Sequence, residues 1–148
     1  MSTVMSSYRV KRPKKYNELL DLLRHKEEGV FDSLKSALIF AAGIGFKNGM
    51  KSSFVETGEP IAFSLFNTQR EQPFVLAMGL HESDNIEYLR DENFLEVVKI
   101  FEEYACGGLE YLEGKLDQAH IKEEIEGMLA EACNDDFLGN IANEWSQN

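Results

Sequence analysis

The chain has 148 residues, of which 43% are hydrophobic and 28% charged, and its formal net charge is −11. This composition is typical of a folded globular protein, and the length suits one domain with a core of its own. We expect neither a membrane span nor a secretory signal, because the sequence has no apolar run of about 18 residues and no apolar segment near its start. With only two cysteines, the chain is expected to be cytoplasmic with reduced thiols.

Charge is distributed unevenly along the chain. Residues 1–52 carry ten basic and five acidic groups, a net charge of +5, whereas the remaining 96 residues carry −16. Such an asymmetry indicates an end that faces a polyanion or a partner, although the acidic part could simply keep the protein soluble. The candidates for phosphate contacts are the basic side chains of the first third: Arg9, Lys11, Arg12, Lys14, Lys15, Lys47 and Lys51.

The first fifteen residues are predicted to form a basic arm. They are polar and lack helical periodicity, and Pro13 disfavours helix in the residue before it. We therefore divide the chain into a flexible arm, residues 1–15, and a single helical domain, residues 16–148. The domain begins with a short helix that Asn17 caps and that the leucines between 19 and 23 anchor.

The clearest helical pattern lies in the second quarter of the chain. Phe31, Leu34 and Leu38 repeat at helical spacing, and three alanines widen this apolar face and let another element approach closely: Ala37, Ala41 and Ala42. Lys47–Gly49 then supplies a basic last turn and residues that tolerate left-handed geometry. The pattern predicts a helix that is buried on most of its circumference.

The pattern changes between residues 54 and 66. Thr57–Pro60 is a turn signal, and the residues after it alternate weakly between apolar and polar. This predicts a short β-hairpin, or otherwise an extended excursion, around residues 54–66. Pro73 fits the first turn of a further helix that extends to His81, with a short strand as the alternative interpretation.

Three further apolar patterns fill the last third. A helix that begins at Asp91 or Asn93 keeps helical spacing until Gly107–Gly108 interrupts it, after which a helix or kinked extension continues. Two shorter apolar faces follow, at 121–132 and 137–145. The predicted fold class is therefore mainly α: a single compact helical domain with at most one short hairpin.

No constellation of residues indicates catalysis or metal binding. The sequence has neither a phosphate-binding glycine loop nor a nucleophile elbow. Asp117 and His120 form a single pair where metal sites in helical bundles need two, and Cys106 is best explained as a small buried residue. Acidic pairs such as Glu102–Glu103 are typical of a solvated helix face. We therefore expect a protein that is not an enzyme and that holds no cofactor and no metal.

Three stretches of the chain carry a family resemblance in combination. They are residues 10–16 (VKRPKKY), 39–49 (IFAAGIGFKNG) and 100–109 (IFEEYACGGL). Over roughly residues 9–118 the chain resembles a family of small proteins associated with Dnd systems, the bacterial loci for DNA phosphorothioation and linked restriction that act against foreign DNA. The resemblance implies a bacterial cytoplasmic protein with an accessory role in DNA modification or defence, and it brings no catalytic residue set.

The same stretches have a structural interpretation. Gly107–Gly108 let two helices meet closely, while Tyr104 buries its ring and needs a partner for its hydroxyl. We single out Phe46 with Lys47 and Lys51, because they place cations beside a helix end and near the basic arm.

Residues and resemblance together predict an adaptor. We expect a non-catalytic accessory protein that docks on larger modification or restriction subunits of the same system, through its acidic C-terminal helices or its apolar helix ends. The alternative is a DNA-contacting module or regulator that binds phosphates through the seven basic residues named above. The expected partners are those subunits, or DNA under the alternative, and no membrane.

Overall fold

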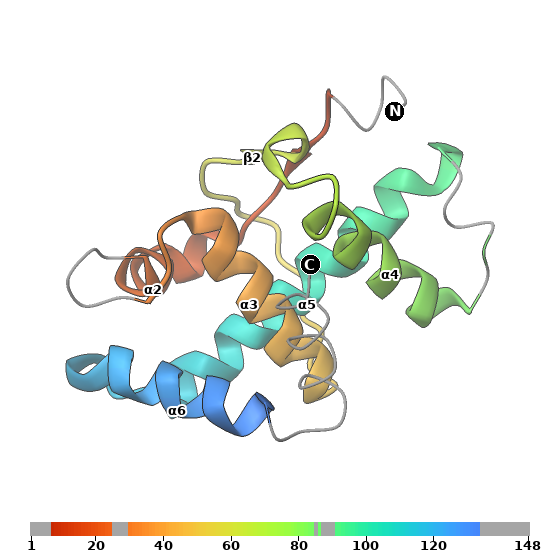
Figure 1. Ribbon diagram of the computed structural model, residues 1–148. Coiled ribbons are helices and arrows are strands. Elements are labelled where there is room, and N and C mark those ends of the chain that lie inside the picture. Colours follow the sequence, from red (N-terminus) through yellow and green to blue (C-terminus); the bar gives the residue numbers. More distant parts are fainter. Residues whose placement is uncertain (1–6, 25–29, 85, 87–90, 134–148) are drawn as a thin grey trace.

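The computed structural model describes residues 7–24, 30–84, 86 and 91–133 (Figure 1). Helices dominate these residues, and the mainly helical class is confirmed. The last helix expected from the sequence, at 137–145, lies outside the described residues. The helices and strands, in chain order, are β1 (Arg9–Val10), α2 (Asn17–Leu23), α3 (Leu34–Lys47), β2 (Ile61–Ala62), α4 (Glu71–Ser83), α5 (Phe94–Lys115) and α6 (Ile121–Cys133). Single 3-10 turns occupy Lys14–Tyr16, Phe63–Leu65, Asp91–Asn93 and Gln118–His120.

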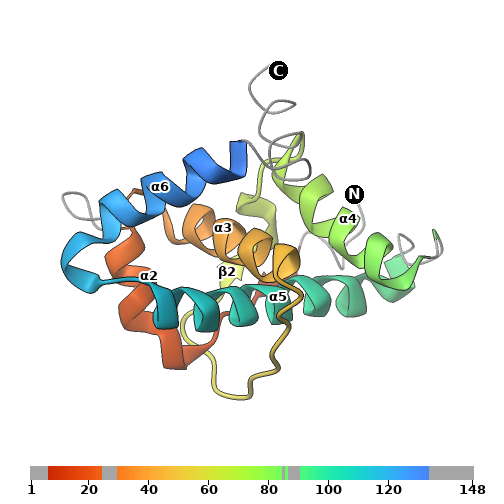
Figure 2. The ribbon, with the colours of Figure 1, turned by 90° about the horizontal axis from the view of Figure 1, so that it is seen from below.

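Two helices that cross at the centre of the molecule organise the fold. Figure 1 shows α3 lying across the long helix α5, and Figure 2 shows α6, α3 and α4 on the same side of α5. Helix α4 also packs on α5, and α2 contacts both α3 and α6. These contacts enclose one core, whose largest fully buried side chains are Phe63, Phe66, Phe101, Leu20, Leu23, Leu38, Leu109, Leu112 and Ile125.

The crossing of α3 and α5 depends on glycine. A Cβ atom on Gly108 would overlap the carbonyl group of Ala41, and one on Gly45 would overlap the carbonyl oxygen of Tyr104. The two backbones therefore touch, as the pair Gly107–Gly108 predicted. The expectation that this pair interrupts the helix is wrong: α5 continues through it without a break, because packing against α3 outweighs the weak helix propensity of glycine.

The other helices lie where their patterns placed them, and their ends follow local signals. Helix α3 begins at Leu34, later than the apolar pattern suggested, because the side chain of Ser33 accepts a hydrogen bond from the backbone N–H of Ser36 (3.1 Å) and caps it. Around Pro73 the chain forms a helix, α4, so the alternative strand is wrong.

The basic segment, expected to form a flexible arm, instead pairs with the rest of the fold. Val10 is completely buried, and β1 pairs antiparallel with β2, with Arg9 opposite Ala62 and Val10 opposite Ile61. The extended stretch expected within residues 54–66 therefore includes a strand, but its partner is the N-terminal segment rather than another part of the same stretch.

Further backbone contacts extend this pairing along the chain. Pro13 forms a bridge with Thr57, and the N–H of Lys14 donates to the carbonyl oxygen of Glu56 (3.0 Å). The segment up to residue 15 is therefore not separate from the domain as expected, since burial of apolar side chains and backbone pairing attach it to the domain. Residues 1–6 of the arm lie outside the described residues.

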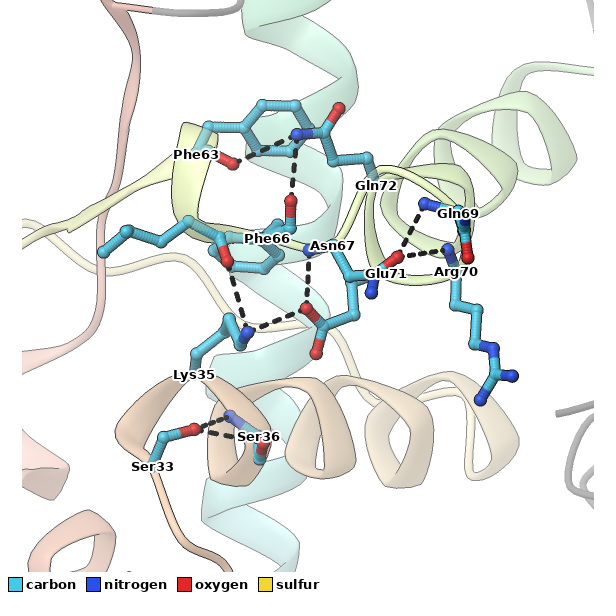
Figure 3. A network of polar contacts seen from close by, with 11 residues as sticks. Ser33, Lys35, Ser36, Phe63, Phe66, Asn67, Gln69, Arg70, Glu71 and Gln72 are labelled. Carbon is cyan, nitrogen blue, oxygen red and sulfur yellow. Dashed lines mark hydrogen bonds and ion pairs between the residues drawn. The ribbon is translucent and has the colours of Figure 1, made fainter. Parts of the chain in front are cut away.

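A polar network joins the start of α3 to the start of α4 (Figure 3). The ammonium group of Lys35 lies 2.8 Å from the carboxylate of Glu71 and donates to the carbonyl oxygen of Leu65 (3.2 Å). Glu71 also accepts from the backbone N–H of Asn67 (2.6 Å). The buried amide of Gln72 donates to two carbonyl groups of the preceding turn (3.1 and 3.4 Å). These contacts fix the turn that follows β2, and hence the strand that holds the N-terminal segment.

The glycine crossing predicts opposite effects for two substitutions in α5. Gly108→Ala forces α3 and α5 apart and lowers the free energy of unfolding by about 3 kcal/mol, the upper end of the usual range for overpacking. Gly114 has no atom within 4 Å of an added Cβ, so Gly114→Ala raises the free energy of unfolding by about 0.5–1 kcal/mol. Urea unfolding followed by circular dichroism measures both, and effects of the same sign would contradict the crossing.

Candidate functional site

The basic residues predicted to contact phosphate fall into two groups. Those of the N-terminal segment that are exposed lie on one stretch of backbone; they are Arg9, Lys11, Lys14 and Lys15. Lys47 ends α3 and Lys51 follows it, and both are exposed too. Lys51 turns to α4, where its ammonium lies 2.6 Å from the carboxylate of Glu82. Lys51 is thus paired with an acidic side chain of α4.

Arg12, the remaining member of the predicted set, is used inside the fold. Only 8% of its surface is exposed. Its Nε donates to the carbonyl oxygen of Glu59 (2.8 Å), and its Nη1 donates to Oδ1 of Asn17 (2.7 Å). Its own carbonyl oxygen accepts from the N–H of Gly58 (2.9 Å). The guanidinium closes the contact between the N-terminal segment and the loop before β2, so its role differs from the predicted phosphate contact.

Lys51 and Tyr104 share one carboxylate. The Tyr104 hydroxyl donates to Oε2 of Glu82 (2.7 Å), which confirms the expected need for a partner. The hydrogen bond to Glu82 raises the pKa of Lys51, and the same bond lowers that of Glu82. Burial and this carboxylate raise the pKa of Tyr104 to about 12. The ring of Phe46 packs on Tyr104 and on His81, at 5.4 and 4.9 Å between centroids, so this cluster braces α3, α4 and α5.

The basic segment runs beside an acidic face of α5. Burial is the main cause that raises the pKa of the Cys106 thiol; Glu110 and Glu103 raise it further, whereas Lys15 lowers it, so all three charges act on the same position. Cys106 is buried, as expected. The carboxylates near Lys15 reduce the positive potential that would attract phosphate.

A pocket of about 490 Å³ opens between the N-terminal segment, the loop after α3, and α5. Its α5 wall is one stripe of the helix: Leu95, Lys99, Glu102 and Glu103. Tyr8, Lys11 and residues 53–55 form the facing walls. The pocket thus combines apolar surface with charges of both signs, and we take it as the candidate functional site.

Glu102 is the residue of this site whose burial differs from the expectation. It was expected on a solvated face, yet only 4% of it is exposed. Its Oε2 accepts from the hydroxyl of Tyr8 (2.9 Å) and from the backbone N–H of Lys11 (2.6 Å). The signal was present in the sequence, because Glu102 lies four residues after Val98 and three before Ala105, on the apolar stripe of the helix.

Burial of Glu102 has electrostatic consequences. It raises the pKa of the carboxyl group above its ordinary value of 4.5, against the hydrogen bonds from Lys11 and Tyr8, which lower it. Burial, with the charge of Glu102 added to it, also raises the pKa of Tyr8. The carboxylate is therefore a strong acceptor that ties the N-terminal segment to α5 at the wall of the pocket.

The predicted pair of Asp117 and His120 has a structural explanation. Oδ1 of Asp117 accepts from the backbone N–H of Ala119 (3.0 Å) and caps the turn before α6, while His120 is exposed. Within residues 7–24, 30–84, 86 and 91–133, no three His, Cys, Asp or Glu side chains are grouped so that they could hold a metal ion. None of the helices in that part of the chain combines the length and hydropathy needed to cross a membrane.

Comparison with protein families gives a match. A family model described as DNA sulphur modification system-associated protein 4 matches residues 9–141, from the first residue of β1 to beyond α6. This confirms the resemblance found in the sequence. Comparison with curated proteins and with solved structures gives no match.

The contacts of Glu102 predict different effects for two substitutions. Glu102→Ala leaves the Tyr8 hydroxyl and the Lys11 N–H without their acceptor and lowers the free energy of unfolding by about 1–3 kcal/mol. Glu102→Gln keeps an acceptor oxygen and removes a buried charge, so at neutral pH its stability equals or exceeds that of the wild type. Urea unfolding of the three proteins measures this, and equal losses in both variants would refute the assigned contacts.

The raised pKa of Glu102 also determines how the free energy of unfolding changes with pH. Above 4.5 this group holds more of its proton in the folded than in the unfolded chain, so its contribution to stability falls as the pH rises through the raised pKa. The free energy of unfolding of Glu102→Gln minus that of the wild type therefore increases as the pH rises from 4.5 through the raised pKa. Unfolding both proteins below 4.5 and at neutral pH tests this, and a constant difference would contradict it.

Proposed function

The chain belongs to the family of DNA sulphur modification system-associated protein 4, and on this basis we propose that it is a non-catalytic accessory protein of such a system. It acts by docking on a larger modification or restriction subunit. The observation that carries the proposal is that Val55 and Leu95, which are 95% and 55% exposed, line the same pocket. Large apolar side chains exposed around a hollow are typical of surfaces that bind another protein.

The placement of Leu95 refines the docking surface expected from the sequence. Leu95 lies in the first turn of α5, so an apolar helix end contributes to the pocket. Among the described residues the large exposed apolar side chains are Val55, Leu65, Ile86 and Leu95, so half of them share one pocket. This supports docking at the pocket.

The charges of the pocket favour a protein over a nucleic acid. Lys11 and Lys99 are accompanied there by Glu102 and Glu103, so a phosphate group would meet two carboxylates as it approached the lysines. A hollow that combines both signs of charge with apolar side chains suits the polar rim and apolar centre of a protein interface.

A second function is favoured by a separate observation. Arg9, Lys14 and Lys15 are exposed on the N-terminal segment and lie outside the pocket lining, where they could contact DNA phosphates. Under this alternative the protein is a DNA-contacting module or regulator of the same system.

Docking through the pocket predicts a loss of capture that depends on position. The tagged protein is co-expressed with the subunits of its host's DNA sulphur modification system and captured, and bound subunits are identified by mass spectrometry. The double variant Val55→Asp with Leu95→Asp reduces capture about tenfold or more, because two apolar side chains are lost from the interface. The control Leu65→Asp, at a residue that is 66% exposed and lies outside the pocket, retains capture. Equal behaviour of the two variants, or no bound subunit with the wild type, would overturn the proposal.

Nuclease treatment and salt dependence distinguish the DNA-contacting alternative from the docking proposal. Under the docking proposal, capture survives nuclease and Lys14→Ala with Lys15→Ala leaves it unchanged. Under the DNA alternative, capture is lost with nuclease, and the double lysine variant lowers the slope of log affinity for duplex DNA against log salt by roughly two. That second pattern, measured by fluorescence anisotropy, would make the basic segment the site.

A further inference from the structure

Among the described residues, one oxygen of Glu102 has no hydrogen-bond partner. Both hydrogen bonds that the carboxylate accepts, from Tyr8 and from the backbone of Lys11, end on Oε2. In the part of the chain that the structure describes, every fully buried side-chain nitrogen or oxygen has a hydrogen-bond partner. Oε1 therefore retains contact with solvent although only 4% of the residue is exposed, and Glu102 lines the pocket.

We propose that this pocket receives a cationic side chain, arginine or lysine, from the docking partner, and that Oε1 of Glu102 accepts its hydrogen bond. The inference rests on the proposed docking function and deepens it. A carboxylate in a mostly buried position attracts a cation more strongly than one in water, because the surrounding dielectric is lower. Glu103, on the same wall, adds a second negative charge.

The apolar walls fit the rest of such a side chain. Arginine and lysine carry a methylene stem that packs on apolar surface while the charged end finds its partner. Phe54, Val55 and Leu95 supply that surface, and the ring of Tyr8 lies beside the carboxylate, where a guanidinium can stack. Arginine is also the charged residue most enriched at interface hot spots.

The two lysines of the pocket further restrict the chemistry of the segment that can bind there. Among the described residues neither Lys11 nor Lys99 has a carboxylate within ion-pair distance, so both repel an isolated cation and attract an anion. The segment that fits therefore carries a carboxylate next to its cation, with apolar neighbours. This chemistry describes a protein segment rather than a polyamine, which has only cations, or a nucleic acid, whose phosphates would meet Glu102 and Glu103.

Peptide probes test this inference without knowledge of the partner. The probe is acetyl-Val-Arg-Glu-Leu-amide, and its control replaces the arginine by citrulline, which has nearly the same shape and no charge. Both are titrated into the full-length ¹⁵N-labelled protein while backbone amide signals are followed. We expect the arginine peptide to shift signals of residues 53–55 and 99–103 and to bind about tenfold more tightly than the citrulline peptide.

Two variants identify the group that recognises the charge. Glu102→Gln keeps the hydrogen bonds to the N-terminal segment and abolishes the preference for arginine over citrulline, whereas Leu65→Asp keeps it. The inference is overturned if the wild type binds both peptides equally, if it binds neither at up to about 10 mM, or if the preference survives Glu102→Gln.

The outcomes also separate this inference from the docking proposal. If the variant with Val55→Asp and Leu95→Asp loses subunit capture but the wild type binds the two peptides equally, docking stands and the proposed recognition of a cationic side chain is wrong. If the arginine peptide binds through Glu102 but no subunit of the system is captured, the pocket chemistry stands and the proposed function fails.

Discussion

The contact of two helix backbones at glycine is the constraint on which the rest of the structure depends. Gly45 and Gly108 let α3 and α5 touch, and a Cβ on Gly107 would overlap the carbonyl oxygen of Met50, so the chain leaving α3 also passes directly over α5. Figure 2 shows this segment continuing to the side of α5 opposite α3. The N–H of Ser52 then donates to the carbonyl oxygen of Glu103 (3.0 Å), which sets the following residues as a wall of the pocket. A crossing made of small residues thus positions a candidate site that contains none of them.

Glu102 links that framework to the N-terminal segment. A buried carboxylate is costly unless it is well bonded, and here one oxygen takes two donors while the residue lines the pocket. A hydrophobic residue at this position would suit the core of α5 and would leave the segment at residues 8–11 without its anchor. A charged residue at this position is therefore favoured only where an anchor for the segment and an accessible acceptor are both required. This is the physical argument that the pocket has a function.

The sequence predicted the features that are local and missed those that join distant parts of the chain. Helical periodicity located α3, α5 and α6, because one apolar face per helix is visible within a few turns. Pairing of β1 with β2 was not predictable, since its partners lie some fifty residues apart and two residues carry no pattern of their own. Arg12 was assigned to phosphate because its internal acceptors, a carbonyl group and Asn17, become neighbours only after folding. Glu102 was the exception: its place on the apolar stripe was visible, and the acidic residue beside it suggested solvent instead.

The anchor of the N-terminal segment also orders events during synthesis. Tyr8 and Lys11 bind a residue that is 94 and 91 positions later in the chain, so their acceptor does not yet exist while most of the protein is being made. Until α5 has left the ribosome, the Tyr8 hydroxyl and the Lys11 N–H lack the carboxylate that they bind in the folded protein. Residues 8–11 therefore gain their anchor on α5 only in a chain that extends beyond residue 102, and a chain arrested before α5 lacks the carboxylate that binds them.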